Sequence, residues 1–435
     1  MSLRFGTDGV RGEALTELTT SFAARLGRAA AEVIGQGRWL IGRDTRESGP
    51  ELEAAVAAGL RAAGAVPLCA GVVPTPALAW LSQTLGLPAA MITASHNPWR
   101  DNGVKVFAPG GLKLVDSVEQ AIEVALHDGR PDPVIDAATP EPIECADAYV
   151  RHMVGLNDRL DGMHVVLDTA NGAMSALAPA VFSALGATVD VIHDAPDGRN
   201  INDACGATHT DRLRTEVVAR GADLGLAFDG DGDRVIAVDH QGDVVDGDRL
   251  IALAALHLRE RGRLHRDTVV VTVMSNLGFH RAMEAAGVRV VTTSVGDRYV
   301  LEALDAGGFS VGGEQSGHVI YRDLATTGDG LLAGLQLAAF LHEHHEPLAS
   351  LAGSVMTSYP QVLVNVRVAE RHPHAADELA QEIADAEARL GADGRVLVRA
   401  SGTEPLIRVM VEAPTDDVAR SVADDLAGHV ARRFG

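Results

Sequence analysis

The sequence predicts an α/β protein with three related α/β domains followed by a smaller α+β C-terminal domain. The chain has 435 residues, which is too long for one ordinary core and suggests about three domains, with an error of one. Stretches at 39–71, 164–192 and 268–297 share one succession of elements: an apolar strand, a polar turn, a helix ending at glycine, and a second strand. Their separation of roughly 100–120 residues indicates a domain-sized repeat, with chance similarity between α/β units as the alternative.

Each repeat is defined by two strands and the helix between them. The first helix is expected from about 50 to 63, and the other two end at Gly186 and Gly287. The strands are expected at 39–46 and 65–71, at 164–173 and 187–192, and at 268–279 and 288–297. This alternation is typical of α/β architecture.

The C-terminal part has a different pattern. Residues 361–369 alternate apolar and polar, as a half-exposed antiparallel strand does. A helix is expected at about 375–390, then strands at 394–400 and 406–413, then a final helix capped by Thr415. The apolar stripe of that helix is expected to be Val418, Val422, Leu426, Val430 and Phe434. We expect domains at 1–150, 151–254, 255–365 and 366–435, with an error of about ten residues at each boundary.

The overall charge restricts the class of partner. A formal net charge of −22 argues against nucleic acid and anionic membranes as partners, because their phosphates attract basic surfaces. A small phosphorylated substrate stays compatible if arginines are concentrated at its site. The N-terminus lacks the apolar segment of a signal peptide, and no apolar run reaches the ~18 residues that a membrane helix needs. With three scattered cysteines and no CxxC pair, we expect a cytoplasmic protein with free thiols.

Three aspartates form the strongest chemical signal. Asp229, Asp231 and Asp233 lie in a glycine-spaced loop between two predicted strands. In a near-extended backbone alternate side chains share one side, so the three carboxylates can converge on one cation. Oxygen ligands favour Mg²⁺ or Ca²⁺, but the glycine and glutamate positions of an EF-hand hold Arg234 and His240, which excludes that calcium loop. A solvated acidic turn is the remaining alternative.

Ser95 is the candidate nucleophile. It lies in a loop rich in Asn, Pro and Gly, directly after the apolar run at 89–92, where a hydroxyl is presented at the end of a buried strand. His96 beside it is a candidate for orienting a phosphate or the hydroxyl. Lys105 follows on a short strand and can return to the same place. Most loop serines are caps or turn residues, so the prediction depends on these neighbours.

Two further loops carry groups that bind anions or hydroxyls. Between Arg399 and Arg408, a Ser-Gly-Thr turn adds backbone N–H groups and hydroxyls to two guanidinium groups, which is the composition of an anion cradle. Salt-bridged strand ends are the alternative there. Glu314, Ser316 and His318 alternate on a glycine-framed loop suited to hydrogen-bonding the hydroxyls of a sugar. Together with the serine and the aspartates, these loops indicate metal-assisted phosphoryl chemistry.

Five motifs resemble the α-D-phosphohexomutases, in the order found in that family. They are FGTDGVRG at 5–12, TASHNP at 93–98, DGDGDR at 229–234, GGEQSGH at 312–318 and RASGTEPLIRVMVE at 399–412. The match covers the whole chain and is highly specific. It implies four domains around a central cleft. It further implies that Ser95 is a phosphoserine in the active enzyme, and that Asp229, Asp231 and Asp233 bind Mg²⁺ together with an oxygen of that phosphoserine.

The resemblance also assigns the other site residues. Glu314 and Ser316 are implied to bind sugar hydroxyls. The non-reacting phosphate of the substrate is assigned to Arg399, Ser401, Gly402, Thr403 and Arg408. The candidates for electrostatic and acid–base roles near the reacting hydroxyl are Arg11, His96, Lys105, Arg234 and His318.

Within the family, the chain is most similar to the branch that interconverts glucosamine 6-phosphate and glucosamine 1-phosphate, on the way to UDP-N-acetylglucosamine. Gln315, TTGDGL near Asp329 and the C-terminal motif support this branch, whereas Thr93 stands where serine is usual and Val104 where isoleucine is common. The implied cofactors are one Mg²⁺ per chain, phosphoserine at Ser95 and glucosamine 1,6-bisphosphate as activator. Ser95 would receive its phosphoryl group from a kinase or from the bisphosphate, and a homodimer is compatible with the family.

Three alternatives differ in activity. The nearest is a phosphomannomutase/phosphoglucomutase, which performs the same chemistry on another sugar. A regulatory protein that binds sugar phosphates without turnover is disfavoured by the intact Ser95, His318 and aspartate triad. A magnesium phosphatase would not need the second phosphate cradle at Arg399–Arg408.

Overall fold

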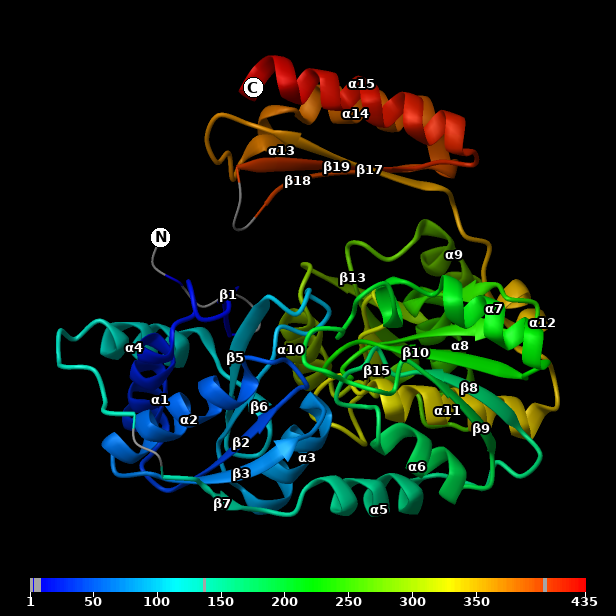
Figure 1. Ribbon diagram of the computed structural model, residues 1–435. Helices are drawn as coiled ribbons and strands as arrows, with labels where there is room; N and C mark the ends of the chain where they lie inside the picture. Colours follow the sequence, from blue (N-terminus) through cyan, green and yellow to red (C-terminus); the bar gives the residue numbers. More distant parts are fainter. Residues whose placement is uncertain (1–2, 4–8, 136–137, 402–404) are drawn as a thin grey trace. The chain divides into compact units, whose positions relative to one another are not determined.

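The computed structural model describes residues 3, 9–135, 138–401 and 405–435. The chain forms two compact units, Met1–Met274 with Val288–Gly353, and Ser275–Gly287 with Ser354–Gly435. The first unit contains three sheets and the second contains one, each accompanied by helices (Figure 1). This mixed α/β architecture confirms the fold class predicted from the sequence.

The first sheet has the order β1-β5-β4-β2-β3-β7, with β6 paired to β5. Its strands are β1 (Val10–Glu13), β2 (Arg38–Arg43), β3 (Val66–Val72), β4 (Ala89–Ile92), β5 (Asp101–Ala108), β6 (Leu112–Lys113) and β7 (Glu141–Pro142). The accompanying helices are α1 (Thr20–Ile34), α2 (Gly49–Ala62), α3 (Thr75–Leu85) and α4 (Asp116–Leu126). Because β5 is antiparallel to β4 and places Lys105 opposite Met91, the lysine lies near the loop that follows β4.

The second sheet has the order β12-β11-β10-β8-β9. Its strands are β8 (His164–Asp168), β9 (Thr188–Ile192), β10 (Leu224–Phe228), β11 (Val235–Asp239) and β12 (Val244–Val245), and its helices are α5 (Ala146–Leu156), α6 (Leu177–Ala184) and α7 (Asp211–Arg220). β8 is parallel to both β9 and β10, whereas β10 and β11 form an antiparallel hairpin. The turn of this hairpin holds the aspartate triad.

The third sheet has the order β14-β13-β15-β16. Its strands are β13 (Thr268–Thr272), β14 (Arg289–Thr293), β15 (Val311–Gly313) and β16 (Val319–Tyr321), and the helices of this stretch are α8 (Gly247–Glu260), α9 (Leu277–Ala285), α10 (Asp297–Gly307), α11 (Gly330–His344) and α12 (Leu348–Val355). In all three predicted repeats the two strands pair in parallel, which confirms the strand–helix–strand reading.

The second unit contains the antiparallel sheet β17-β19-β18. Its elements are β17 (Gln361–Arg367), α13 (Ala375–Glu378), α14 (Ala380–Leu390), β18 (Arg395–Ala400), β19 (Leu406–Glu412) and α15 (Asp416–Phe434). Thr415 caps α15 as predicted, since its hydroxyl accepts the N–H of Val418 at 3.4 Å.

Two expectations for this unit are correct only in part. The expected stripe residues Val422, Leu426, Val430 and Phe434 are buried, whereas Val418 is not, and the expected helix is divided into two. The helix expected at 375–390 is interrupted at Leu379, whose φ of −104° and ψ of 17° depart from the α-helical region. Val418 is 43% exposed, and Ala419 is fully buried in its place. Each four-residue step exceeds a helical turn by about 40°, so a series of four such steps drifts off one face.

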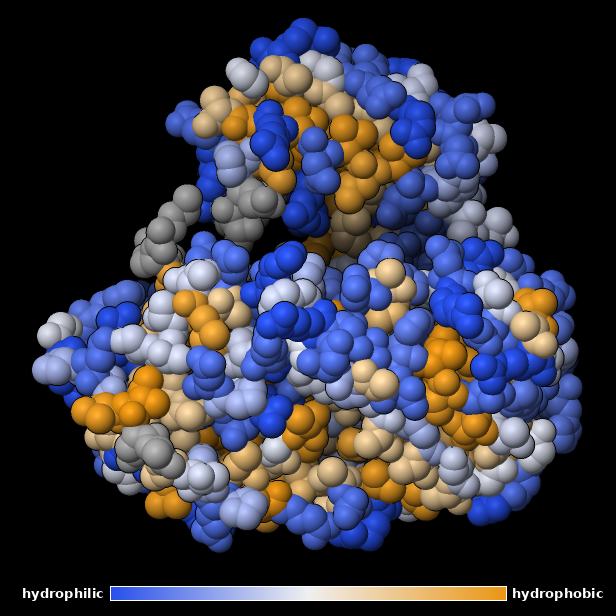
Figure 2. Space-filling model, in the orientation of Figure 1, coloured by the Kyte–Doolittle hydropathy of each residue, from blue (hydrophilic) through white to orange (hydrophobic). Residues whose placement is uncertain are grey.

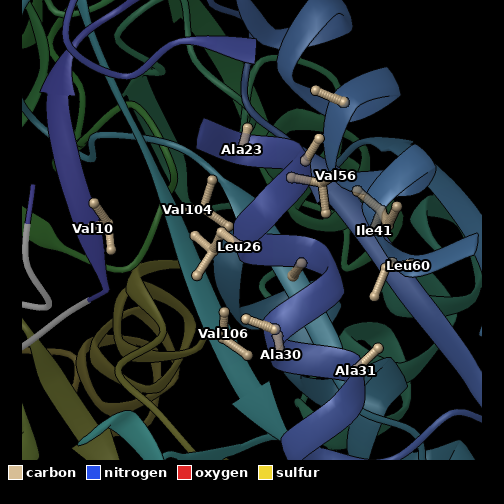
Figure 3. Close-up of a cluster of buried hydrophobic side chains, with 14 of the residues drawn as sticks. Val10, Ala23, Leu26, Ala30, Ala31, Ile41, Val56, Leu60, Val104 and Val106 are labelled. Carbon is tan, nitrogen blue, oxygen red and sulfur yellow. The ribbon is translucent and has the colours of Figure 1, made fainter. Parts of the chain in front are cut away.

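The core of the first sheet is formed by α1 packing between β5 and α2. Figure 3 shows Leu26 and Ala30 of α1 beside Val104 and Val106 of β5. Small residues allow the two helices to approach closely. A Cβ atom at Gly59 of α2 would lie 1.9 Å from the carbonyl oxygen of Ala24, so glycine is required there.

Polar side chains cover most of the visible surface, where apolar residues gather only in small groups (Figure 2). Among the described residues, none of the helices is both long enough and apolar enough to cross a membrane.

Candidate active site

Ser95 lies three residues after the end of β4, buried and with a φ of 54°. Its backbone N–H donates to the Thr93 hydroxyl at 2.9 Å, and that hydroxyl donates to Asp44 at 2.7 Å. The Ser95 hydroxyl donates to Oδ2 of Asp229 at 2.6 Å. A left-handed conformation is uncommon for serine, so this loop is held by its surroundings rather than by local preference.

The Ser95 loop is held mainly by Arg46, which sequence analysis did not identify. Its guanidinium group pairs with Asp44 at 2.9 Å and donates to the carbonyl oxygens of Ser95 at 3.0 Å and Asn97 at 2.8 Å. Asn202, from the region of the second sheet, donates to the same Ser95 carbonyl at 2.8 Å. Arg46 could have been identified from the sequence, because it is one of the charged residues that directly follow the buried strand β2.

The aspartate triad converges as predicted, but by a different backbone path. One carboxylate oxygen from each of Asp229, Asp231 and Asp233 lies within 4.8 Å of the others, and all three side chains are buried. The backbone is a turn rather than near-extended: Gly232 has a φ of 72°, and its N–H donates to the Asp229 carbonyl at 3.0 Å. Glycine permits this left-handed turn, which carries the carboxylates to one side.

Lys105 returns to the triad, as predicted. Its Nζ lies 2.8 Å from Oδ2 of Asp231 and 2.9 Å from Oδ2 of Asp233. Thr75, at the start of α3, donates its hydroxyl to Asp231 at 2.6 Å and was not foreseen from the sequence. These contacts come from residues far apart in the chain and join the first two sheets at one point.

Burial and neighbouring charges separate the carboxylates electrostatically. Burial and the charges of Asp233 and Asp231 raise the pKa of Asp229 well above its ordinary value. Burial would also raise the pKa of Asp233, but the charges of Lys105 and His318 outweigh it and hold that pKa well below its ordinary value. The triad therefore has one carboxylate that a further cation would stabilise as an anion.

The two histidines predicted for the site have opposite properties. Burial, together with the charges of Arg234 and Arg11, lowers the pKa of His96 to about 4, so its ring is neutral at neutral pH. Its Nδ1 lies 3.3 Å from the Ser95 hydroxyl. His318 is buried, and although burial lowers its pKa, the charges of Asp233 and Asp297 raise it above the ordinary value.

Asp297 at the start of α10 was missed by the sequence analysis. Its Oδ2 lies 3.3 Å from Nε2 of His318, and the other ring nitrogen is 3.6 Å from Asp233. Lys113 of β6 forms an ion pair with the same Asp297 carboxylate. His318 is thus held between two carboxylates at the end of the GGEQSGH motif.

Among the remaining predicted residues of the first unit, Arg234 contacts this centre directly. Arg234 donates its backbone N–H to Asp229 at 3.2 Å, and its Nε lies 3.8 Å from Asp233. Arg11 lies on β1, opposite Gly103. Glu314 accepts the N–H of Gly296 at 3.1 Å, and burial raises its pKa, whereas Ser316 is exposed.

The predicted phosphate cradle lies in the second unit. Arg399 of β18 and Arg408 of β19 are directly opposite each other in the antiparallel ladder. Burial and the charge of Arg408 lower the pKa of Arg399. Ser401 is buried and donates its N–H to the Leu406 carbonyl at 2.8 Å, while Gly402 and Thr403 lie outside the described residues. Within the described chain, no carboxylate forms an ion pair with either arginine.

Comparison with known proteins finds four domains of one family, in order along the chain. Models of the phosphoglucomutase/phosphomannomutase family match as α/β/α domain I at residues 2–131, α/β/α domain II at 147–242, α/β/α domain III at 246–359 and the C-terminal domain at 363–429. The chain belongs to this family. It is therefore related to the phosphohexomutases, which are isomerases, as the motifs indicated.

Relatives that match over their full length indicate one branch of the family. A phosphoglucosamine mutase of Rhodococcus opacus is 52% identical over 99% of the chain and 100% of the relative. Another, of Frankia casuarinae, is 54% identical over 98% and 97% of the two chains.

Solved structures agree on the fold. A phosphoglucomutase/phosphomannomutase family protein of Burkholderia thailandensis is 27% identical, with a TM-score of 0.83 over 98% of this chain and 97% of that one. The N-acetylphosphoglucosamine mutase of Aspergillus fumigatus, solved with GlcNAc-6P and magnesium, has a TM-score of 0.70 over 99% of this chain and 96% of that one. At 19% identity it shows the shared fold alone.

Proposed function

We propose that the chain is a phosphoglucosamine mutase that interconverts glucosamine 6-phosphate and glucosamine 1-phosphate. The observation that carries the proposal is the Ser95 hydroxyl, which lies 2.6 Å from Asp229 within the buried aspartate triad. Full-length relatives named phosphoglucosamine mutase support the choice of sugar. The enzyme is then an isomerase that moves a phosphoryl group between two hydroxyls of one substrate.

The triad fits Mg²⁺. All its ligand atoms are carboxylate oxygens, and Oδ1 of Asp231 is buried with no hydrogen-bond partner in the described part of the chain. We assign Asp229, Asp231 and Asp233, with an oxygen of phosphorylated Ser95, as the ligands. Mg²⁺ bound there supplies positive charge that offsets the negative charge of the transferring phosphoryl group.

The transfer itself requires no external reactant. The free hydroxyl oxygen of the sugar attacks the phosphorus on Ser95, so one P–O bond forms while the bond to Oγ of Ser95 breaks. The hydroxyl proton leaves as the new P–O bond forms and Ser95 regains a proton, and His318 is the candidate acid–base residue for this exchange. The resulting 1,6-bisphosphate turns end for end and returns its other phosphoryl group to Ser95. Lys105, Arg234 and Arg11 stabilise the charge of the transferring group, and His96 orients the Ser95 hydroxyl.

Substrate binding needs contacts away from the reacting oxygen. We assign Glu314 and Ser316 to sugar hydroxyls, and Arg399, Ser401, Gly402, Thr403 and Arg408 to the phosphate that is not transferring. No carboxylate in the described part of the chain pairs with Arg399 or Arg408, which supports this assignment because a phosphate dianion would satisfy both.

The other expectations remain predictions. Ser95 is first phosphorylated by a kinase or by glucosamine 1,6-bisphosphate, and the latter serves as activator. The domains divide at 150/151, 254/255 and 365/366. We also predict that the protein is cytoplasmic and that it forms a homodimer.

A coupled assay with glucosamine, glucose and mannose phosphates tests the substrate. These sugars share their configuration at carbons 3 and 4, so discrimination falls on position 2, where glucosamine carries a largely cationic amine. Gln315 makes the loop polar and tolerant of that amine. We expect kcat/KM for glucosamine phosphate to exceed that for glucose phosphate at least about tenfold, which corresponds to ~1.4 kcal/mol. Equal or faster turnover of glucose or mannose phosphate would instead identify a phosphomannomutase/phosphoglucomutase.

A further inference from the structure

A second cluster of potential ligands lies at the carboxyl ends of β8 and β9. Asp168 is the last residue of β8, His193 directly follows β9, and Cys205 precedes the short helix η1 (Gly206–Thr208). One ligand atom from each lies within 4.8 Å of the others. Nδ1 of His193 is 3.0 Å from Oδ2 of Asp168. The parallel pairing of β8 with β9 brings the aspartate and the histidine together.

Backbone N–H groups and burial hold the side chains of this cluster in place. The Asp168 carboxylate accepts the N–H groups of Ala170 and Gly206, each at 3.0 Å, which fixes its orientation. Asp168 and Cys205 are both fully buried. Five of the ten described non-glycine residues with a positive φ lie in the surrounding loops, and such strain tends to gather at functional sites. They are Ala170, Asn171, His193, Asn202 and Ala204.

We propose that Asp168, His193 and Cys205 bind a divalent transition-metal cation of the Zn²⁺ class. One oxygen, one nitrogen and one sulfur are donors typical of a tetrahedral zinc site with an open fourth position. The oxygen-only triad at Asp229 suits Mg²⁺ instead, so the two sites select different ions. Zinc ligands lie about 2.0–2.3 Å from the metal, hence roughly 3.3–3.8 Å from each other, so no pair in the cluster needs to contract by more than about 1.5 Å, and the Asp168–His193 pair needs to widen slightly.

The thiol gives this site a distinctive signature. Burial, reinforced by the charges of Asp168 and Asp203, raises the pKa of Cys205 to about 12, so the thiol is protonated at neutral pH without a metal. A coordinated thiol loses its proton. Metal binding therefore converts Cys205 from an inert buried thiol to a metal thiolate, which has its own absorption.

The site also adjoins the supports of the Ser95 loop. Asn202, three residues before Cys205, donates its side-chain amide to the carbonyl oxygens of Ser95 at 2.8 Å and Asn97 at 3.1 Å. Thr45 donates its hydroxyl to the Asn171 carbonyl at 2.7 Å. A cation held by the cluster would fix the 200–206 loop from which Asn202 reaches the Ser95 loop.

Titration with Co²⁺ in the presence of excess Mg²⁺ tests the proposal, because cobalt bound to a thiolate absorbs in the near ultraviolet. We expect this band at one equivalent in the wild type. It should persist in Cys69→Ser, a matched change at a half-buried cysteine outside the cluster, and in Asp231→Asn, which alters only the oxygen site. It should disappear in Cys205→Ser. His193→Gln should weaken cobalt binding at least about tenfold, the lower bound for changes around a metal site.

Two results would overturn the proposal: no thiolate band in the wild type, or a band that survives in Cys205→Ser. Circular dichroism establishes whether Cys205→Ser is folded. If it is not, His193→Gln decides, since its histidine is partly exposed, and an unchanged cobalt affinity in that variant would contradict the site. No outcome depends on mutase activity, so the proposed function and this site are tested separately.

Discussion

The Ser95 centre and the arginine pair at Arg399 and Arg408 manage charge in opposite ways. At the Ser95 centre, Lys105 pairs with Asp231 and Asp233, and His318 lies between Asp233 and Asp297, so the protein neutralises its own cations. In the second unit, Arg399 and Arg408 face each other, and no described carboxylate forms an ion pair with either. On a chain with a formal net charge of −22, two facing arginines that pair with none of the described carboxylates are a specific arrangement.

This difference separates chemistry from binding. The Ser95 centre holds its groups in a fixed network with a place for one further cation, as the raised pKa of Asp229 indicates. The arginine pair needs an anion brought by the ligand. Changes at the first region should therefore affect kcat, and changes at the second should affect KM.

The largest effect is expected for Ser95→Ala. Without the hydroxyl there is no phosphoryl carrier, and mutase turnover should fall by at least about 10³-fold. Thr93→Ser is the matched control, because it keeps the hydroxyl that supports the same loop, and we expect activity close to wild type. Near-normal turnover of Ser95→Ala in the coupled assay would remove Ser95 from the mechanism.

Next in size is Asp231→Asn. It removes one of the three carboxylates and one partner of Lys105, so kcat should fall by on the order of 10² or more, with a weakened Mg²⁺ dependence. Asp243→Asn makes the same chemical change at an exposed site near the β11–β12 turn and should have little effect. Wild-type activity that persists in excess chelator would show that the triad is not a catalytic metal site.

A third substitution tests the arginine pair of the second unit. Arg408→Ala should raise KM by about 10–150-fold with a smaller change in kcat, because a lost charge-assisted contact costs roughly 1.5–3 kcal/mol. Arg420→Ala, an exposed arginine of α15, is the control. Steady-state kinetics that leave KM unchanged for Arg408→Ala would exclude it as a phosphate ligand.

Asp329 tests how the chain tolerates a buried carboxylate without a cation. Tyr149 and the N–H of Leu332 donate to it at 2.5 and 2.9 Å, and burial raises its pKa to about 6. The pKa of Asp329 is higher in the folded protein than in the unfolded chain. Protonation of Asp329 therefore stabilises the fold, fully so below about pH 4, and this stabilisation is lost as the pH rises through 6. The difference between the folded and unfolded pKa values of Asp329 corresponds to about 3 kcal/mol in the free energy of unfolding.

Asp329→Asn should therefore unfold at a higher temperature relative to wild type at pH 7.5 than at pH 4.5. Asp246→Asn controls for the loss of an N-cap carboxylate, because Asp246 caps α8 in the same way. A difference between Asp329→Asn and wild type that does not change with pH would contradict the raised pKa.

Local sequence patterns predicted the main groups that converge at the candidate site but not the residues that hold them in place. Ser95 after β4, the aspartate turn after β10 and the return of Lys105 followed from strand order and glycine spacing. Thr75 could not be found this way, because its partner Asp231 lies 156 residues away and the contact depends on how the first two sheets meet. Asp297 lies much closer in the chain to His318, but it is the first residue of a helix and no local motif joins it to the histidine.

Side-chain facing was also only partly predictable. The exposed Val418 shows that a four-residue repeat does not follow a helix of 3.6 residues per turn. The interruption at Leu379 has no glycine or proline beside it to signal it. Convergence of the three aspartates was predicted, whereas the turn that produces it depends on Gly232.

The path of the phosphoryl group tests the central claim most directly. Dephosphorylated protein is incubated with glucosamine 1,6-bisphosphate carrying labelled phosphate, and peptides are then mapped. The account predicts label on the peptide containing Ser95, and its transfer to sugar when unlabelled glucosamine 6-phosphate is added. Label on another residue, or release only as inorganic phosphate, would contradict it.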